Sequence, residues 1–357
     1  MAAIVCTSRD LFQLIGAFQA GVYEELRPYF RQAYYRGYYA RDKSKAALHI
    51  AIARNKPSVV QRLYRCVPHM FSPAAMDLAA SFGHLEVLRV LHSLGCSCST
   101  SAMDAAAQAG FLDIVQFLHA HRTEGCTTFA LSAALREGHV AVAGFLLQHR
   151  TEGCSPDVVD NVAWHGQLSL LRLLHATGTP GFSSRTMDFA AGAGHLVVVE
   201  FLHRERREGC SVDAMNDAAR RGWLAVVQFL HNHRHEGCTT DAMDDAASAG
   251  HLDVVTFLHT HRREGCTTDA MDLACRNGHF DVVHFLYHHR TEGCTVSALN
   301  DAVQHGHRPI IEFLCTHCRP WCNLTQALKI ASQRGRLDLV DCLSTPVAAT
   351  VAPRDAS

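Results

Sequence analysis

Three features are scarce or missing in this 357-residue sequence: an excess of one charge, long apolar runs and the motifs of common enzyme families. Lys and Arg total 33 and Asp and Glu total 34, so the chain as a whole has no general attraction for nucleic acids or anionic membranes. No stretch approaches the length of an apolar transmembrane helix. Residues 1–13 lack the basic and apolar segments of a secretory signal peptide, so we expect no membrane association.

Catalytic motifs are missing as well. The chain has no Gly-x-Ser-x-Gly turn, no phosphate-binding glycine loop and no His-Glu-x-x-His pair. The sequence therefore predicts a protein that is not an enzyme and has no cofactor. Its 15 cysteines occur without an export signal in a chain far longer than a disulfide scaffold. This favours reduced thiols and a cytoplasmic or nuclear location.

The sequence does contain an internal repeat of 28 residues. The segment from Ala270 to Leu286 recurs along almost the whole chain, and a glycine in its middle marks the period. The glycines at this interval are Gly110, Gly138, Gly166, Gly194, Gly222, Gly250, Gly278 and Gly306, with Gly83 and Gly335 one residue out of step at either end. Such even spacing indicates a repeat architecture.

Each repeat predicts two short helices joined by a turn at this glycine. Small and apolar side chains in residues 242–247 stand at i, i+1, i+4 and i+5, which forms one closely packing helix face, and Gly250 ends this helix. The second helix begins near His251, and Gly265 is expected to cap its C-terminal end. Its predicted buried side consists of Leu252, Val255, Phe257 and Leu258.

The start of each first helix carries residues suited to capping. Asp213 precedes Asn216 by three positions and Asp241 precedes Asp244 in the same way, a spacing that resembles a capping box. One such helix pair cannot bury its own apolar face. We therefore expect neighbouring pairs to stack into a curved solenoid with a continuous core.

The iterated pattern Ala-Ala-x-x-Gly-His-Leu-x-Val-Val-x-Phe-Leu resembles the two helices of the ankyrin repeat over roughly residues 46–343. The usual ankyrin period is about 33 residues, so these repeats are shorter, and the usual Thr-Pro-Leu-His opening is replaced by segments such as 241–244. The second helix is expected to be about a turn longer, and the β-hairpin segment shrinks to Thr239 and Thr240. With linkers such as residues 122–128, this variant resembles ankyrin arrays abundant in water moulds, amoebae and large amoeba viruses. The resemblance implies an all-α, ankyrin-like helix-turn-helix solenoid with reduced or absent β-hairpin fingers.

The two ends do not follow the repeat. We predict a helical N-terminal cap over residues 1–44, a solenoid of about eleven repeats over 45–344, with atypical repeats at its ends, and a disordered tail over 345–357. An alternative for residues 1–44 is an F-box-like segment, although the Leu-Pro opening typical of F-boxes is missing. In that case the protein would be a substrate adaptor of a ubiquitin ligase.

The recurring cysteines and histidines are interpreted as structural. Cysteine at one repeat position suits a small buried side chain, and the histidines of the Gly-His turn and after Phe-Leu are expected to hydrogen-bond loop backbone between repeats. The cysteines at this position are Cys126, Cys154, Cys210, Cys238, Cys266 and Cys294. Metal binding is an alternative, with the densest thiol and imidazole cluster in residues 315–322. Nucleic-acid binding through the Arg- and Tyr-rich residues 31–41 is a further alternative.

Variation between repeats predicts the partner-binding surface, because residues that are the same in every repeat are required by the fold, whereas residues that vary are available to bind a partner. The pair before each first-helix glycine varies most, and the resemblance implies that it faces a concave groove. The candidate residues are Phe82, Gln108, Arg136, Glu137, Trp164, His165, Arg220, Arg221, Arg276, Asn277, Gln304 and His305. We expect Trp164, with Arg136 and Arg220, to dominate the binding energy, because Trp and Arg are frequent interface anchors.

The predicted function is that of a non-enzymatic intracellular scaffold for protein–protein interaction. The partner is expected to be a protein rather than a nucleic acid, no metal is assigned, and the chain is expected to be a monomer.

Overall fold

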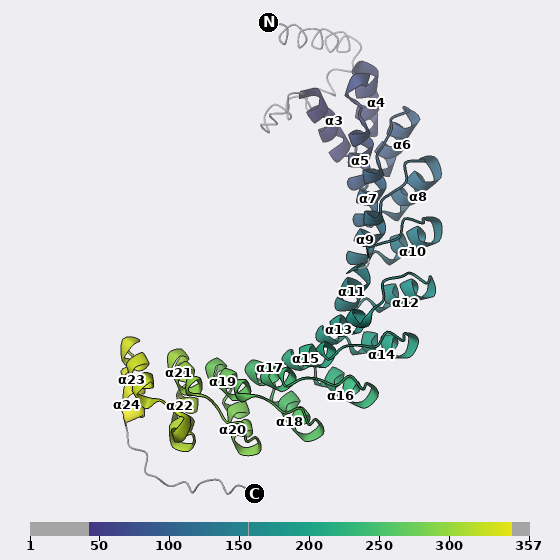
Figure 1. Ribbon diagram of the computed structural model, residues 1–357. Helices are drawn as coiled ribbons and strands as arrows, with labels where there is room; N and C mark the ends of the chain where they lie inside the picture. The colour runs from purple at the N-terminus through teal and green to yellow at the C-terminus, as the bar shows by residue number, and fades with distance from the viewer. Residues whose placement is uncertain (1–42, 156, 345–357) are drawn as a thin grey trace. The chain divides into compact units, whose positions relative to one another are not determined.

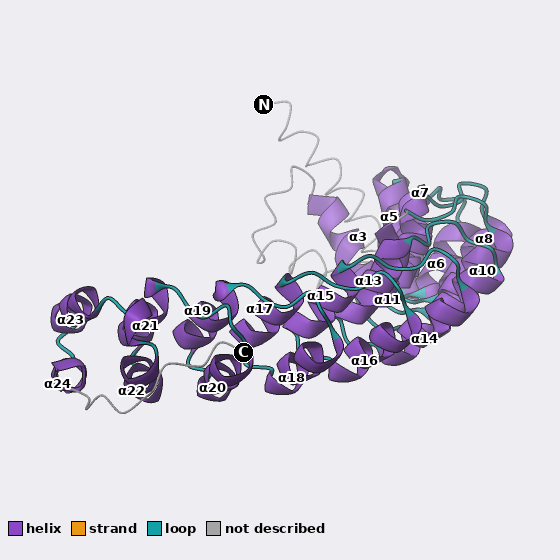
Figure 2. Cartoon of the chain, turned by 60° about the horizontal axis from the view of Figure 1, so that its bottom comes forward, coloured by secondary structure: helices purple, strands orange, loops and turns teal. Residues whose placement is uncertain are grey.

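The computed structural model describes residues 43–155 and 157–344. Within these ranges the chain is helical and contains no β-strand (Figure 2). This confirms the predicted all-α, ankyrin-like solenoid, and no β-hairpin finger is present in the described part of the chain. The predictions for the F-box-like segment and for the tail fall almost wholly on residues 1–42 and 345–357, so they lie outside the described residues.

The described helices form eleven consecutive pairs (Figure 1). The first helices of the pairs are α3 (Lys43–Ala53), α5 (Pro73–Ser81), α7 (Thr100–Gln108), α9 (Thr128–Arg136), α11 (Asp157–Trp164), α13 (Ser184–Gly192), α15 (Asp213–Arg220), α17 (Asp241–Ala249), α19 (Thr268–Asn277), α21 (Val296–His305) and α23 (Leu324–Gln333). The second helices are α4 (Pro57–Cys66), α6 (Leu85–Ser93), α8 (Leu112–His121), α10 (Val140–His149), α12 (Leu168–Ala176), α14 (Leu196–Glu205), α16 (Leu224–His233), α18 (Leu252–His261), α20 (Phe280–His289), α22 (Arg308–His317) and α24 (Leu337–Ser344). Two short 3₁₀-helices, η1 (Pro68–Met70) and η2 (Arg319–Trp321), lie in the linkers after α4 and α22.

The chain divides into two compact units, one made of residues 1–158 and 169–181 and the other of residues 159–168 and 182–357. Inside each unit, neighbouring first helices pack more closely than neighbouring second helices. The alanine-rich face of the first helices permits this close approach, since its side chains are small. The first-helix side is therefore the inner side of each stack.

The buried faces of the helices match the prediction for the first helices and differ in part for the second. Ala242, Met243, Ala246 and Ala247 of α17 are all buried, as predicted. In α18 the buried residues are Val254, Val255 and Leu258. Leu252 and Phe257 are only half-buried, so the predicted buried side was wrong for these two positions. The ring of Phe257 lies on the flank of the helix, edge-on to His231 of the preceding repeat at 5.5 Å.

Glycine ends the first helix as predicted but does not end the second. Gly250 caps α17 in the left-handed conformation, with φ of 81°. α18 instead ends at His261 with an extended residue, Arg262, so Gly265 lies in the linker and is not the predicted cap. For the same reason the second helix does not extend through Arg-x-Glu-Gly-Cys; this segment forms the linker to the next repeat.

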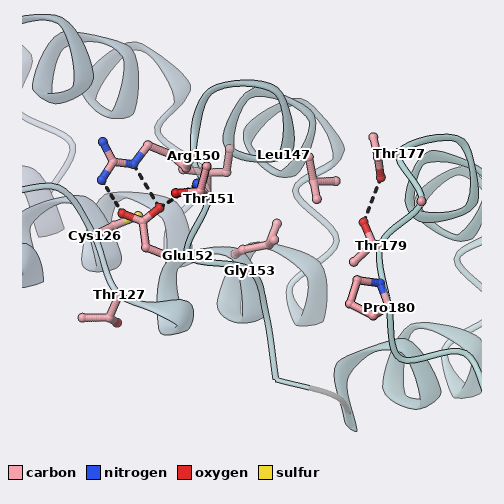
Figure 3. Close-up of a pocket in the computed structure, with 13 residues that line it drawn as sticks. Cys126, Thr127, Leu147, Arg150, Thr151, Glu152, Gly153, Thr177, Thr179 and Pro180 are labelled. Atoms are coloured by element: carbon pink, nitrogen blue, oxygen red, sulfur yellow. Dashed lines mark hydrogen bonds and ion pairs between the residues drawn. The ribbon is translucent and has the colours of Figure 1, made fainter.

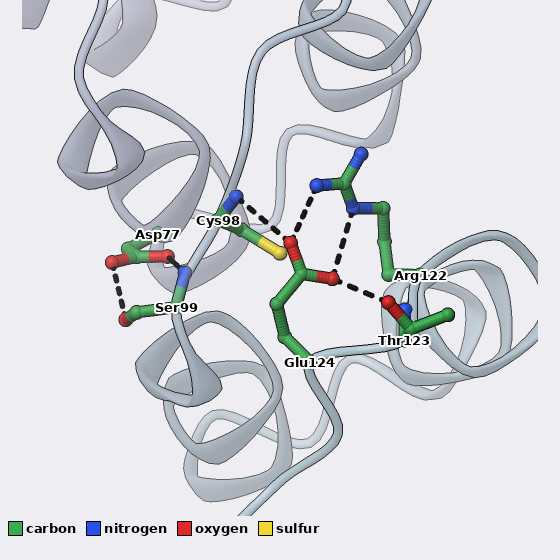
Figure 4. Close-up of polar contacts among 6 residues, drawn as sticks. All are labelled: Asp77, Cys98, Ser99, Arg122, Thr123 and Glu124. Atoms are coloured by element: carbon green, nitrogen blue, oxygen red, sulfur yellow. Dashed lines mark hydrogen bonds and ion pairs between the residues drawn. The ribbon is translucent and has the colours of Figure 1, made fainter.

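The capping box predicted within the first helices is also wrong for α17. Its N-cap, Thr240, makes no side-chain capping bond, and Asp244 reaches the next repeat instead. The Asp244 carboxylate accepts hydrogen bonds from the Thr267 backbone N–H at 2.8 Å and from its hydroxyl at 2.7 Å. The same connection joins Asp77 to Ser99 (Figure 4), Asp104 to Thr127, Asp188 to Ser211, Asn216 to Thr239, and Asp272 to Thr295. The first helices are thus tied to one another by buried polar side chains as well as by packing.

Candidate partner-binding surface

The structure places the predicted contact residues at the C-terminal ends of the first helices. All of them are exposed except Trp164, which is half-buried at the end of α11. Phe82, a large apolar residue, is 46% exposed. These residues therefore follow the inner side of each stack, where a partner can reach them.

Trp164 stands in a cluster of aromatic and arginine side chains in the second unit. The guanidinium carbon of Arg221 lies 4.6 Å from the centroid of its indole ring, and the Phe189 ring meets the indole edge-on at 6.0 Å. Arg185 in turn lies 5.3 Å from the Phe189 centroid, with its Nε 3.7 Å from a carboxylate oxygen of Asp160. We call Trp164, Arg185, Phe189 and Arg221 the tryptophan cluster.

Arg221 reaches Trp164 across a whole intervening repeat. The repeat between them carries Gly192 and Ala193 at the two variable positions, so no long side chain separates the guanidinium from the indole. The end of α11 is also held in place, because His195 Nε2 lies 2.9 Å from the carbonyl oxygen of Trp164. The cluster is therefore already formed in the free chain.

The arginines that the sequence grouped with Trp164 lie elsewhere. Arg220 forms an ion pair with Asp217 at 2.5 Å instead of contacting the indole. Arg136 belongs to the first unit, where its guanidinium lies 5.8 Å from the ring centroid of Phe129. The arginine on Trp164 is Arg221.

Sequence reasoning missed Phe189 and Arg185, although both break the repeat pattern. The position of Arg185 holds Asp213 in the next repeat, and that of Phe189 holds Asp217. A search for departures at every repeat position, and not only at the pair before the glycine, would have found them.

Several predicted contact residues use part of their polar capacity within the stack. The side-chain amide of Asn277 donates to the backbone carbonyl of Ser248 at 2.7 Å. His165 Nδ1 lies 2.8 Å from the backbone carbonyl oxygen of Asn161. These contacts fix the orientation of both side chains but leave their outer edges exposed.

The histidines fall into two structural groups. Four of the six histidines of the Gly-His turn, His84, His139, His195 and His307, bond a backbone carbonyl of the preceding repeat, as predicted. His139 Nε2, for example, lies 3.1 Å from the carbonyl oxygen of Gln108. For those after Phe-Leu the prediction was wrong. The buried Nδ1 atoms of His119, His203, His231 and His259 have no hydrogen-bond partner among the described residues, and the same holds for His92, which follows Val90-Leu91 at the equivalent position. These rings pack against aromatic rings of the next repeat.

Comparison with known proteins identifies the repeat. A three-copy model of ankyrin repeats matches residues 76–160 and 271–352, and a many-copy model of ankyrin repeats matches residues 243–287. The chain belongs to the ankyrin repeat family. Ankyrin repeats are typically non-catalytic scaffolds for binding. A search of curated protein sequences found no match.

Two solved structures are similar to this ankyrin array at low level. Both are crystal structures of the pentatricopeptide repeat protein PPR10 in complex with an 18-nt psaJ RNA element, one of them of a triple cysteine-to-serine variant. Each is 12% identical, with a TM-score of 0.42, and the match covers 87% of this chain and 54% of the other. The chain thus spans about half the length of these proteins.

The ankyrin array shows no metal centre and no membrane-spanning helix in its described parts. No group of three or more His, Cys, Asp or Glu side chains there is placed to hold a metal ion. In the 315–322 cluster, Cys318 is fully buried. The pKa of the Cys294 thiol is raised, mainly by its hydrogen bond with Cys318 and next by burial. Among residues 43–155 and 157–344, no helix has both the length and the apolar character needed to cross a bilayer.

Proposed function

We propose that this ankyrin repeat array is a non-enzymatic protein-interaction scaffold with the tryptophan cluster at the centre of its contact surface. The observation that carries the proposal is the pairing of Arg221 with Trp164 across two repeats. Trp and Arg dominate the binding energy of many interfaces, and side chains already held in place lose less entropy when a partner binds. The tryptophan cluster thus offers Trp and Arg side chains that are already held in place, on the first-helix side of the second unit.

The chemistry of the cluster favours a partner segment that carries an acidic residue beside an apolar one. Arg221 can donate paired hydrogen bonds to a carboxylate, and the accessible parts of the half-buried Trp164 and Phe189 rings can take an apolar side chain. Arg185 lies 3.7 Å from Asp160, a looser contact that leaves it able to bind a second acceptor. Arg220, by contrast, already contacts Asp217, so a partner carboxylate would have to compete for it.

The proposal is tested by affinity capture from a lysate of the source organism, followed by mass spectrometry and by binding measurements with the purified candidate. The double variant Trp164→Ala, Arg221→Ala should lose the direct partner, with affinity falling by at least about 30-fold, because two anchors worth roughly 1–2 kcal/mol or more each are removed. Gln304→Ala, His305→Ala serves as the matched control, since these residues occupy the same repeat positions outside the cluster.

The outcomes separate the alternatives. Loss of a protein partner in the cluster variant, with retention by the control, supports the proposal. Equal retention by both variants contradicts it, and so does recovery of a partner that nuclease treatment removes, because that partner would be a nucleic acid.

A further inference from the structure

The linkers between repeats carry a repeated ion pair on a surface separate from the tryptophan cluster. In the first of these pairs, Arg122 and Glu124 lie 2.5 Å apart, and Glu124 also accepts from the backbone N–H of Thr123 at 3.1 Å and of Cys98 at 3.4 Å (Figure 4). The hydrogen bond from Arg122 is the main reason that the pKa of Glu124 falls to about 2. We call each such Arg-x-Glu contact a linker ion pair. The others are Arg150–Glu152, Arg206–Glu208, Arg234–Glu236, Arg262–Glu264 and Arg290–Glu292.

Four of the six linker ion pairs cover a glycine of the preceding linker, those of Arg150, Arg234, Arg262 and Arg290. A Cβ atom added to Gly125 would overlap the Arg150 guanidinium, and Gly237 has the same relation to Arg262. Gly125 is buried under this cover. In these four linkers the guanidinium rests on the glycine of the linker before it, and each ion pair is neutral as a whole.

The stack of linker ion pairs is interrupted after α12. Gly178 stands where the linkers on either side have Arg, and Pro180 stands where they have Glu. Gly153, which the missing pair would cover, is exposed and has no neighbouring atom within 4 Å of an added Cβ. In the helix alongside, Leu147 replaces the histidine that His119 and His175 supply in the adjacent repeats.

These departures surround a cavity of about 220 Å³ inside the first unit (Figure 3). Its walls are the Arg150–Glu152 pair on one side, Thr177 and Thr179 on the other, and Leu147 between them. The two threonine hydroxyls are 2.8 Å apart. The cavity thus offers an apolar wall, hydroxyl groups and a neutral ion pair at the place where the regular array has another ion pair.

We infer that this cavity binds an Arg-x-Glu segment of a partner protein, whose arginine and glutamate take the place of the missing linker ion pair. The arginine stem would lie along Leu147 while its guanidinium covers Gly153, as the Arg150 guanidinium covers Gly125. The partner's own glutamate would neutralise that guanidinium. The charge of Arg150 is no obstacle, because Glu152 already pairs with it.

The size of the cavity supports a side-chain pair over a free small molecule. Pockets that enclose drug-sized ligands usually measure about 300–1,000 Å³, which is larger than this cavity. Arginine is favoured over lysine because a planar guanidinium can both cover a glycine backbone and donate to a carboxylate and to hydroxyl groups.

The test uses the full chain and a fluorescein-labelled peptide, acetyl-Thr-Arg-Thr-Glu-Gly-amide, with binding followed by fluorescence anisotropy. The same peptide with lysine in place of arginine is expected to bind at least about tenfold more weakly, because it cannot form the paired hydrogen bonds. Leu147→Trp, which fills the cavity, should abolish binding. His119→Leu is the control: it changes the equivalent position of the adjacent repeat, outside the cavity lining, and should leave peptide binding unchanged.

A second variant keeps the inference testable if Leu147→Trp fails to fold. Pro180→Glu supplies a carboxylate where the other linkers have one, so the Arg-x-Glu peptide should bind more weakly and an Arg-x-Gln peptide more tightly than to the wild-type chain. The inference is overturned if the lysine peptide binds equally well, if Leu147→Trp folds and still binds, or if no binding occurs at millimolar peptide. Trp164→Ala should leave peptide binding unchanged, so this site and the tryptophan cluster can fail independently.

Discussion

Asp244 in one repeat holds Thr267 in the next through two hydrogen bonds, one to the backbone N–H and one to the hydroxyl. Asp244 is only 6% exposed, and removing its carboxylate would remove two charge-assisted hydrogen bonds between the repeats. We predict that Asp244→Ala lowers the free energy of unfolding by about 2–3 kcal/mol. Urea titration followed by circular dichroism measures the loss.

The control for this prediction exists in the chain itself. Asn216, at the same repeat position, accepts from the Thr239 N–H at 3.0 Å and donates to its hydroxyl at 2.9 Å. Asp244→Asn should therefore cost clearly less than Asp244→Ala. Equal losses for the two substitutions would show that the hydrogen bonds between repeats contribute little.

The glycine turn between the two helices of a repeat offers a test of inter-repeat packing. Gly250 and Gly95 both have positive φ, at 81° and 75°, so alanine is strained at either position, by roughly 1–2 kcal/mol. At Gly250 the added methyl group would also overlap the His279 ring, whereas nothing lies within 4 Å at Gly95. Gly250→Ala is thus expected to lower the melting temperature more than Gly95→Ala, and a reversed order would contradict this account.

Trp223 replaces histidine at one Gly-His turn and makes the equivalent contact. Its indole N–H donates to the backbone carbonyl of Gly192 at 3.1 Å, as His195 Nε2 contacts that of Trp164 at 2.9 Å. We predict that Trp223→His changes the free energy of unfolding little, whereas Trp223→Phe, which has no donor, costs about 1 kcal/mol. Chemical denaturation of the two variants decides the matter: if phenylalanine is tolerated as well as histidine, the ring matters and the hydrogen bond does not.

The repeat architecture could be predicted from the sequence because its evidence is periodic. The alternation of alanine-rich and Val-Val-x-Phe-Leu segments around each glycine places Ala246 and Val255 in the core whatever the neighbouring repeats do. The direction of the polar contacts could not be predicted in this way. Asp244 has the spacing of a capping residue in its own helix, and only stacking shows that it bonds a residue 23 positions further on.

The composition of the candidate site was predictable only in part, for a similar reason. Trp164 is an evident departure from the repeat, but the sequence grouped it with Arg136 and Arg220, whereas the arginine that contacts its indole is Arg221. Arg221 reaches the indole because Gly192 and Ala193 leave space in the repeat between them, and such a contact depends on side-chain direction across two repeats. The cavity beside Leu147 could not be predicted for the same reason. The residues that depart from the repeat there, Gly178 and Pro180, lie 31 and 33 positions after Leu147, and only the structure shows that they line one cavity.

Because the pKa values of three histidines after Phe-Leu are lowered in the folded chain, we predict that its stability decreases in mild acid. Burial, followed by the nearby charges of Arg262 and His261, lowers the pKa of His231, and Glu264 opposes this only weakly. The unfolded chain, in which histidine titrates near 6.5, therefore binds more protons than the folded chain below that pH. The free energy of unfolding should fall as the pH drops through about 6.5 towards the lowered folded pKa. The pKa values of His203 and His259 are also lowered, first by burial and then by neighbouring Arg and His charges, and these two residues add to the effect.

The measurement is a series of urea titrations between pH 7.5 and 5.5, above the range where most carboxylates titrate. His231→Leu should reduce the slope of unfolding free energy against pH, because it removes one of the groups that bind a proton more readily after unfolding. Leucine is a compatible replacement, since Leu147 occupies the equivalent position in another repeat. The exposed His305→Leu is the control and should leave more of the slope in place. If both substitutions change the slope equally, the acid sensitivity does not come from the histidines packed between repeats.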